Sequence, residues 1–371
     1  MRHQRVVVGM IDGFGTDYFA SHPMPNLRAA ARGGLHRDVR AIMPTVTNVN
    51  NVSISCGALP CEHGLTGNSW FDEVRGEADY MESAQHIRLP NLSERAAAAG
   101  VRSALLTCKR KTVNLLGPGA ELALAAEAPD PAFVERHGPP GDIYSREINY
   151  WLWEVAIDLL RTRPELGVVY VHTTDYPMHR WAPDRDESLE HLARLDALIG
   201  RAIEAAPDAA FFFTADHGMN YKTRCWDLNH ACRDLQVPVR FALSAEKDRY
   251  IKHHRTFGGT AYVWLNDPDD ADRVARGVAG LDGVEAVLPR TEAAARFGLM
   301  PERIGELVVL GDRQTVFGEL PGPQEALEPG YRSHGSLHES DVPLIVHNWR
   351  GTLPDAGRFE RNADLVSFLF R

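Results

Sequence analysis

The chain has 371 residues, of which 44% are hydrophobic and 24% are charged, an ordinary composition for a globular protein. Its net charge of −10 argues against nucleic acid or an anionic membrane as the main partner. A small anionic substrate stays compatible with this charge, because the local charge at a binding site matters more than the total. We therefore expect a small-molecule substrate, no nucleic-acid partner and no membrane partner, and we allow for a homodimer.

Localisation follows from the chain start and the cysteines. No apolar stretch reaches membrane-spanning length, and the first apolar run begins directly after MRHQR, which leaves no room for a signal peptide. The five cysteines are odd in number and form no CxxC pair. This pattern predicts free thiols in a reducing cytoplasm and argues against a cysteine-based zinc site.

Continuous apolar runs recur along the chain and end at polar residues. They are VVVGMID, ending at Asp12; SALLTCKRK, with Lys109 and Lys111; GVVYVHTTD, ending at Asp175; AAFFFTADHG, with Asp216 and His217; and VPLIVH, which His334 precedes. Such runs are typical of parallel strands covered on both faces. Amphipathic helical patterns alternate with them, at 26–34, 92–100, 146–162 and 187–206, the last with Asp186 as its expected N-cap.

This alternation predicts an α/β fold with a mostly parallel central sheet and helices on both faces. Residues 246–329 have a different pattern, strand–helix–strand–helix–strand, bounded by HHRTFGG and a Pro/Gly-rich segment. We predict a small inserted α+β cap domain over 246–329, and a core domain formed by 1–245 and 330–371.

The polar residues at the strand ends have the chemistry of a metal site. In an open parallel sheet, ligands bind at the carboxyl ends of the strands, where these residues would gather. Asp216 and His217 are adjacent, and Asp175 and His179 have D-x-x-x-H spacing. Carboxylates mixed with imidazoles suit Zn²⁺ or Mn²⁺ better than Mg²⁺. A single such residue is more simply a cap or a solvated loop residue, but carboxylates at the ends of buried strands are costly without a cation.

Two further groups of residues leave alternatives open. Thr45, Thr47 and Ser53 precede or enter a helical stretch, where a hydroxyl beside a metal becomes a nucleophile, although an N-cap threonine explains them equally well. Only five of the 40 basic residues are lysines, and Lys109 and Lys111 flank Arg110. On an extended segment both would point the same way, toward a carboxylate or phosphate, unless they form a solvated basic turn.

Several motifs carry a family resemblance in their order along the chain. They are Asp12-Gly13, PTVTN, GLTGN, D-x-x-x-H, ADHGM and the SHG that precedes the last strand. The chain thereby resembles the alkaline phosphatase superfamily, in its type I phosphodiesterase/nucleotide pyrophosphatase branch. Within that branch TCKRKTVNLLG, DRYIKHHRTFGG and PERIGELVVL resemble the phosphonoacetate hydrolase family.

The resemblance implies two Zn²⁺ ions, with Mn²⁺ or Fe²⁺ as alternatives. It implies these roles: Asp175, His179 and His334 on one zinc; Asp12, Asp216, His217 and the Thr47 oxygen on the other; Thr47 as nucleophile; Asn68 on a phosphonyl oxygen; Lys109 and Lys111 on the substrate carboxylate. The chain departs from the family in TNVNN, where a proline commonly follows the first Asn. It also has Arg110 in place of an acidic residue, which adds positive charge and leaves room for a bulkier or more anionic substrate than phosphonoacetate.

These expectations lead to a metal-dependent hydrolase that cleaves the P–C bond of phosphonoacetate, or of a close carboxylated phosphonate, through a phosphothreonine, releasing phosphate and acetate. The alternative is a phosphodiesterase or phosphomonoesterase of the nucleotide pyrophosphatase type, with Trp70, Tyr80 and Trp181 as candidates for a nucleobase slot. A non-catalytic metal-binding or ligand-binding module is a third interpretation. His253, His254 and Lys222 are read most simply as ordinary packing or solvated residues.

Overall fold

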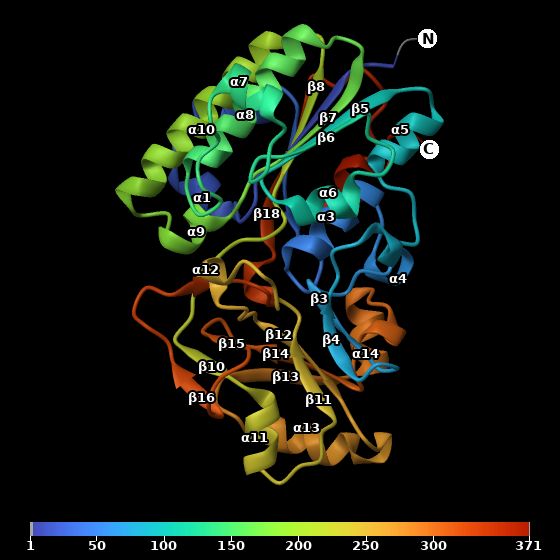
Figure 1. Ribbon diagram of the computed structural model, residues 1–371, viewed down its shortest axis with the longest axis vertical. Helices are drawn as coiled ribbons and strands as arrows, with labels where there is room; N and C mark the ends of the chain where they lie inside the picture. The colour runs from blue at the N-terminus through green and yellow to red at the C-terminus, as the bar shows by residue number, and fades with distance from the viewer. Residues whose placement is uncertain (1–2, 371) are drawn as a thin grey trace.

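A seven-stranded sheet forms the centre of the computed structural model, which describes residues 3–370 (Figure 1). In spatial order its strands are β2 (Leu35–Arg40), β18 (Asp341–His347), β8 (Ala210–Thr214), β1 (Val6–Met10), β7 (Leu166–His172), β5 (Arg102–Thr107) and β6 (Leu122–Ala125). Strands β8, β1, β7, β5 and β6 run parallel, whereas β18 is antiparallel to both of its neighbours. The predicted mostly parallel sheet is confirmed.

Helices cover both faces of this sheet, as expected for parallel strands built from apolar runs (Figure 1). One group contains α7 (Pro131–His137), α8 (Glu147–Thr162), α9 (Tyr176–Arg180) and α10 (Asp186–Ala205), with α1 (Thr16–Ser21) and α2 (Pro25–Arg32) nearby. The other contains α3 (Thr47–Cys56), α4 (Pro60–His63), α5 (Leu92–Ala98) and α6 (Arg110–Leu116). The N-cap of α10 is Arg185 and not Asp186 as predicted, because Asp186 is already the first helical residue.

A second unit lies at one end of the large sheet (Figure 1). Its antiparallel sheet contains β11 (Phe241–Ser244), β12 (Thr260–Trp264), β14 (Leu307–Gly311) and β13 (Val284–Pro289). A smaller sheet contains β15 (Thr315–Phe317), β10 (Arg224–Trp226) and β16 (Gln324–Ala326). The helices are α11 (Leu228–Asp234), α12 (Ile251–His254), α13 (Ala271–Ala279) and α14 (Arg290–Phe297), and the hairpin of β3 (Ser69–Asp72) and β4 (Glu77–Tyr80) lies against β11.

This second unit starts earlier in the sequence than the predicted boundary at residue 246. That boundary falls between β11 and β12, which pair with each other over Phe241–Trp264 and Ser244–Ala261. The segment before β11 also belongs with the insertion, because β10 pairs with β15 and β16. The pattern of residues 224–245 resembles that of the core, so only the strand pairing assigns it to the second unit.

The direction of β18 brings its first residues to the edge of the sheet where the parallel strands have their carboxyl ends. Leu344 of β18 lies opposite Thr214, the last residue of β8, so Asp341 lies beyond the carboxyl end of β8. A residue preceding a parallel strand would lie at the opposite edge. His334 therefore reaches the same edge as Asp216 because the last strand is antiparallel. Just before β18, β17 (Arg332–Ser333) pairs with β9 (Asn220–Tyr221), which follows the Asp216–His217 segment.

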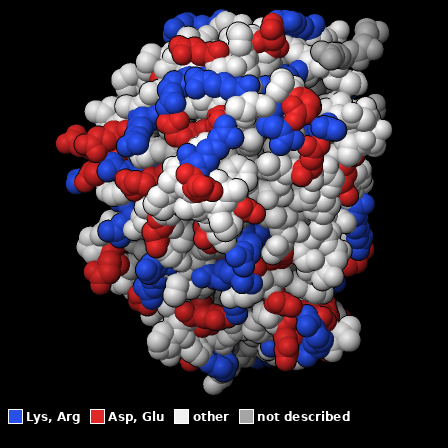
Figure 2. All heavy atoms as spheres, turned by 45° about the horizontal axis from the view of Figure 1, so that its top comes forward, with Lys and Arg blue, Asp and Glu red and all other residues white. Residues whose placement is uncertain are grey.

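Surface and thiol properties agree with the composition. All five cysteines are free, as predicted, and four of them are buried. Basic and acidic side chains are interspersed over the face shown in Figure 2, where no single basic field dominates. Within residues 3–370 no helix is long and apolar enough to cross a bilayer.

Lys222 is not a solvated loop residue: it is buried, and its ammonium lies 2.8 Å from Oε1 of buried Glu339.

Candidate metal centre

The predicted strand-end residues meet at the carboxyl edge of the large sheet. Asp12 follows β1, Asp175 follows β7, and Asp216 follows β8, and these three strands are neighbours. Hydrogen bonds join the three segments: the backbone N–H of Asp12 donates to Thr173 Oγ1 (3.0 Å), and that of Gly13 donates to Asp216 Oδ1 (3.0 Å). Adjacent parallel strands with short loops therefore suffice to gather the three carboxylates.

The first cluster contains Asp175, His179 and His334, all buried, with ligand atoms close enough to share one metal ion. Asp175 and His179 lie one turn apart at α9, and His179 Nε2 lies 2.9 Å from Asp175 Oδ2. His334 Nε2 lies 3.7 Å from the same oxygen. The Nδ1 atom of each histidine faces a backbone carbonyl, that of Arg332 or Thr45, at 2.8 Å. These carbonyl contacts fix the rings so that both Nε2 atoms face the cluster, an arrangement typical of metal ligands.

The second cluster contains Asp12, Asp216 and His217, also buried. His217 Nε2 lies 3.5 Å from Asp12 Oδ1 and 3.4 Å from Asp216 Oδ2, while its Nδ1 faces the carbonyl of Gly218 at 2.9 Å. The ring of His217 stacks on that of His334, with centroids 3.5 Å apart, so the two clusters adjoin.

Buried polar atoms in both clusters have no hydrogen-bond partner, and they are the atoms that a metal would contact. They are Asp12 Oδ1, Asp216 Oδ2, His217 Nε2 and His334 Nε2. Burial lowers the pKa of both His217 and His334, so both imidazoles are neutral and free to coordinate. Burial and the adjacent Asp12 carboxylate raise the pKa of Asp216 well above its ordinary value. A cation beside these two carboxylates would relieve that repulsion, so the donor set fits a bound metal ion.

Lys109 lies between the two clusters. Its ammonium is 3.0 Å from Asp12 Oδ2 and 3.0 Å from Asp175 Oδ1, and its side chain is only 4% exposed. Burial alone would lower the pKa of Lys109, but the two carboxylates outweigh burial and raise it well above its ordinary value. Asp175 has the opposite balance: burial acts to raise its pKa, and Lys109 and His179 hold it well below the ordinary range. Lys109 thus supplies positive charge to carboxylates from both clusters.

The two lysines do not lie on an extended segment as predicted, because Lys109 caps α6 and Lys111 lies in its first turn. They nevertheless point to one place, since the Tyr250 ring centroid lies 5.8 Å from Lys109 Nζ and 5.3 Å from Lys111 Nζ. Both ammoniums are buried, which excludes the solvated basic turn. Lys111 forms an ion pair with buried Asp248.

Thr47 is the first residue of α3 and is buried, with contacts to the site on either side of it. Two residues earlier, the carbonyl of Thr45 meets His334. The following residue, Asn48, donates its backbone N–H to Asn68 Oδ1 at 2.9 Å. This bond fixes the Asn68 amide, whose Nδ2 donates to Glu246 Oε1 at 3.0 Å. Thr45 has a structural role, because its hydroxyl donates to the carbonyl of Ser336 at 2.8 Å. Ser53 contacts His63 instead of the clusters.

Sequence reasoning missed a third cluster beside these two, formed by Glu246, Asp248 and His254. His254 Nε2 lies 3.1 Å from Glu246 Oε1, and Glu246 Oε2 lies 3.6 Å from His334 Nδ1. His253 is also part of the site, with its Nε2 3.5 Å from Asp175 Oδ1. The signal was present in the double histidine of DRYIKHHRTFGG, but ordinary packing was the simpler explanation.

His172 is another residue that the sequence did not single out. It is the last residue of β7, and its Nε2 lies 3.3 Å from Asp12 Oδ2 while its Nδ1 faces Thr107 Oγ1 at 3.0 Å. Burial lowers the pKa of His172. The imidazole therefore contacts the Asp12 carboxylate as a neutral group and helps to orient it.

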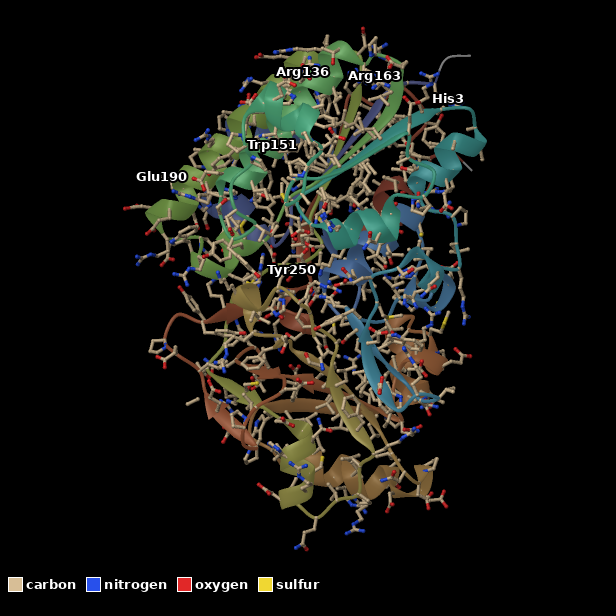
Figure 3. All side chains as sticks on the ribbon, in the orientation of Figure 1. His3, Arg136, Trp151, Arg163, Glu190 and Tyr250 are labelled. Carbon is tan, nitrogen blue, oxygen red and sulfur yellow. The ribbon has the colours of Figure 1, made fainter. Side chains whose placement is uncertain are left out.

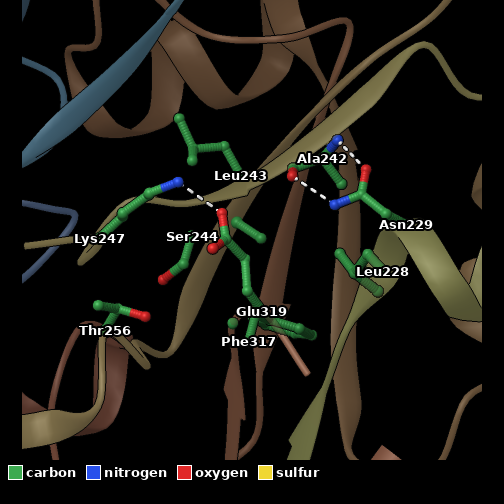
Figure 4. Close-up of a pocket in the computed structure, with 11 residues that line it drawn as sticks. Leu228, Asn229, Ala242, Leu243, Ser244, Lys247, Thr256, Phe317 and Glu319 are labelled. Carbon is green, nitrogen blue, oxygen red and sulfur yellow. Dashed lines mark hydrogen bonds and ion pairs between the residues drawn. The ribbon is translucent and has the colours of Figure 1, made fainter. Parts of the chain in front are cut away.

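Two hollows differ in whether they could hold a ligand. The crevice in Figure 4, beside the Lys247–Glu319 ion pair, has a volume of about 10 Å³, room for at most one water. A second pocket, of about 400 Å³, lies against Lys111 and Tyr250. Its size is in the range of small-molecule sites. Trp70, Tyr80 and Trp181 are absent from the described lining of this pocket.

Comparisons with known proteins identify the fold and the family of this chain. A family model described as type I phosphodiesterase/nucleotide pyrophosphatase matches residues 6–337. The structure superposes on phosphonoacetate hydrolase of Sinorhizobium meliloti 1021, solved with phosphonoformate and with phosphonoacetate, with a TM-score of 0.88 and 28% identity over 100% of this chain and 97% of that one. Murine ectonucleotide pyrophosphatase/phosphodiesterase 5 shares the fold, with a TM-score of 0.71 and 17% identity over 99% and 94% of the two chains.

Curated relatives match a shorter part of the chain. Venom phosphodiesterase of Naja atra is 25% identical over 227 residues, which are 58% of this chain and 26% of the venom protein. An uncharacterized pyrophosphatase/phosphodiesterase of Schizosaccharomyces pombe is 27% identical over 58% of this chain and 44% of its own. The chain thus spans less than half the length of these two relatives. The family model, however, covers most of the chain, which therefore belongs to the type I phosphodiesterase/nucleotide pyrophosphatase family.

Proposed function

We propose that this chain is a two-zinc hydrolase that cleaves the P–C bond of phosphonoacetate, or of a close carboxylated phosphonate, to phosphate and acetate. The observation that carries the proposal is the pair of buried ammoniums, Lys109 and Lys111, beside two metal-type clusters and both within 5.8 Å of the Tyr250 ring centroid. In this proposal Asp175, His179 and His334 hold one zinc, and Asp12, Asp216, His217 and the Thr47 oxygen hold the other. Mn²⁺ or Fe²⁺ could replace zinc with the same ligands.

The zinc ions, when bound, would supply Lewis-acid stabilisation of the phosphonyl oxygens. Thr47 Oγ forms a bond to phosphorus as the P–C bond breaks, and the bonding electron pair moves to the methylene carbon. Water supplies the proton that converts this carbanion to acetate, and the hydroxide that remains takes up the proton lost by the Thr47 hydroxyl. A second water then attacks phosphorus, releasing phosphate and returning a proton to Thr47. Asn68, oriented by the Asn48 N–H, would donate to a phosphonyl oxygen.

The lysines make the carbon leaving group feasible. Negative charge that develops on the methylene carbon spreads onto the substrate carboxylate, where fixed positive charge stabilises it. The raised pKa of Lys109 keeps that ammonium charged throughout the physiological pH range. An ester oxygen leaves without such help, so an esterase would have no need of two buried lysines at this position.

Ester hydrolysis is the second candidate, and one observation favours it. Asp248 already pairs with Lys111, so its carboxylate reduces the positive charge that a phosphonoacetate trianion would meet. A less charged phosphate ester would be less affected by this carboxylate. The family also includes phosphodiesterases, as the Naja atra relative illustrates by its name.

Phosphate release distinguishes the two candidates. Zinc-loaded protein would be assayed with phosphonoacetate, with 4-nitrophenyl phosphate and with bis(4-nitrophenyl) phosphate, and again after chelation and after return of Zn²⁺, Mn²⁺ or Fe²⁺. We expect chelator-sensitive turnover of phosphonoacetate, and we expect Lys111→Ala to raise KM for phosphonoacetate at least about tenfold more than for either ester. Rapid ester turnover with no phosphonate cleavage would reject the P–C proposal.

A further inference from the structure

The 400 Å³ pocket adjoins the proposed site of the leaving group and has no role in the proposed chemistry. Three of its lining residues, Arg110, Lys111 and Asn114, come from α6, and Arg110 and Asn114 are four residues apart, on the same face of that helix. Tyr144, Tyr250 and Arg249 line it from other segments. Acetate needs only a small part of this volume, so the pocket has room for a longer leaving group.

Tyr250 lines the pocket and also lies beside the two lysines. Its ring faces Lys109 and Lys111 as described above, and its hydroxyl donates to Glu127 Oε1 at 2.6 Å, across to the large-sheet domain. Figure 3 places Tyr250 between the large sheet and the second unit. Lys111 belongs to both places, because its side chain lines the pocket while its ammonium pairs with Asp248. A substrate carboxylate near the lysines would therefore lie next to the pocket.

Most charged groups in the pocket already have a partner. Arg249 pairs with Glu82 at 2.6 Å, Lys111 pairs with Asp248, and Glu127 accepts the Tyr250 hydroxyl. Among the residues that the structure describes, the Arg110 guanidinium and the Asn114 side-chain amide have no recorded hydrogen bond or ion pair. The groups that remain available to a ligand are thus the positively charged Arg110 guanidinium, with its planar set of N–H donors, and the Asn114 amide. Together they suit an oxyanion.

We propose that this pocket binds a second carboxylate at the far end of the leaving group, with Arg110 as the main contact and Asn114 beside it. The substrate is then a phosphonate with two carboxylates, one near Lys109 and Lys111 and one at Arg110. This inference rests on the proposed function and names its substrate class. A guanidinium suits this role because its planar fork matches a carboxylate and stays charged.

Binding to a variant that lacks the nucleophile tests the inference without relying on turnover. Zinc-loaded Thr47→Ala protein would be titrated calorimetrically with phosphonoacetate and with 2-phosphonobutanedioate, which adds one CH₂–carboxylate arm. We expect the dicarboxylate to bind at least about tenfold more tightly. Adding Arg110→Ala should reduce this preference to within about twofold, and Arg110→Lys should retain part of it. Arg161→Ala, which removes an exposed arginine of α8 outside the pocket, is the matched control and should leave the preference unchanged.

Two results would overturn the inference: equal affinity for the two phosphonates, or an equal loss for both ligands in Arg110→Ala. Turnover by the wild-type protein distinguishes failure of this inference from failure of the proposed function. Cleavage of phosphonoacetate together with equal affinities would reject only the second carboxylate. Absence of cleavage with either phosphonate would reject the P–C reaction, while the affinity ratio would still decide whether the pocket recognises a carboxylate.

Discussion

Replacing Lys109 by methionine should destabilise the protein strongly without metal and only weakly with zinc. The Lys109 ammonium lies 3.0 Å from two buried carboxylates, Asp12 and Asp175. Removing it leaves both carboxylates without their main cation, and breaking a buried pair in this way costs about 3–5 kcal/mol. Zinc ions at the two clusters would neutralise the same carboxylates. In the loaded protein the substitution should then cost about 1 kcal/mol, as expected for a volume-conserving replacement.

Urea unfolding, followed by tryptophan fluorescence with and without zinc, measures both costs. Lys247→Met is the matched control, because Lys247 pairs with exposed Glu319 at 2.5 Å and should cost about 1 kcal/mol or less in either condition. The same thermodynamic cycle requires Lys109→Met to bind zinc more tightly, about tenfold for each 1.4 kcal/mol of difference. Equal destabilisation with and without zinc would refute the idea that lysine and metal compete for these carboxylates.

Two further predictions concern the proposed nucleophile and a buried histidine that belongs to neither metal-type cluster. Thr47→Ala should lower kcat by at least about 10³-fold, with zinc content measured in parallel as the control. Thr47→Ser keeps a hydroxyl and should retain part of the rate. If Thr47→Ala kept a tenth of the activity, Thr47 could not be the nucleophile. Burial lowers the pKa of His191 from 6.5 to about 3, while its Nδ1 stays 2.9 Å from the Tyr150 hydroxyl. The unfolded chain binds a proton at His191 more readily than the folded protein does. The contribution of His191 to the free energy of unfolding should therefore be fully present above pH 6.5, and it should fall by about 1.4 kcal/mol per pH unit as the pH drops toward 3. His191→Gln should flatten this slope in unfolding measured from pH 7 to pH 4, and an unchanged slope would contradict the burial argument.

The proposed specificity depends on residues from both units of the chain. Lys109 and Lys111 come from the end of β5 and the start of α6, whereas Asp248, Tyr250 and His254 come from the segment after β11. The inserted unit therefore does more than cover the clusters at the edge of the large sheet. It supplies Asp248, which pairs with Lys111, and the Tyr250 ring, which lies beside the ammoniums of Lys109 and Lys111. Substitutions in this segment should alter substrate preference more than metal content.

The apolar runs of the sequence were sufficient to predict β1, β7 and β8 and the aspartates that follow them, because each run is local and each loop is short. The i, i+4 spacing of Asp175 and His179 likewise required only one helical turn. Local patterns carry such information because burial on both faces of a strand dictates an unbroken apolar run.

The remaining features depended on contacts between distant segments. Only the antiparallel direction of β18 explains why His334 joins Asp175, and only the pairing of β11 with β12 shows where the inserted unit begins. The ion pair of Lys111 with Asp248 and the approach of Glu246 to Asn68 are also invisible in the sequence. The physical reason is that periodicity records whether a residue is buried, whereas strand direction and charge pairing are decided by which surfaces meet when the two units pack.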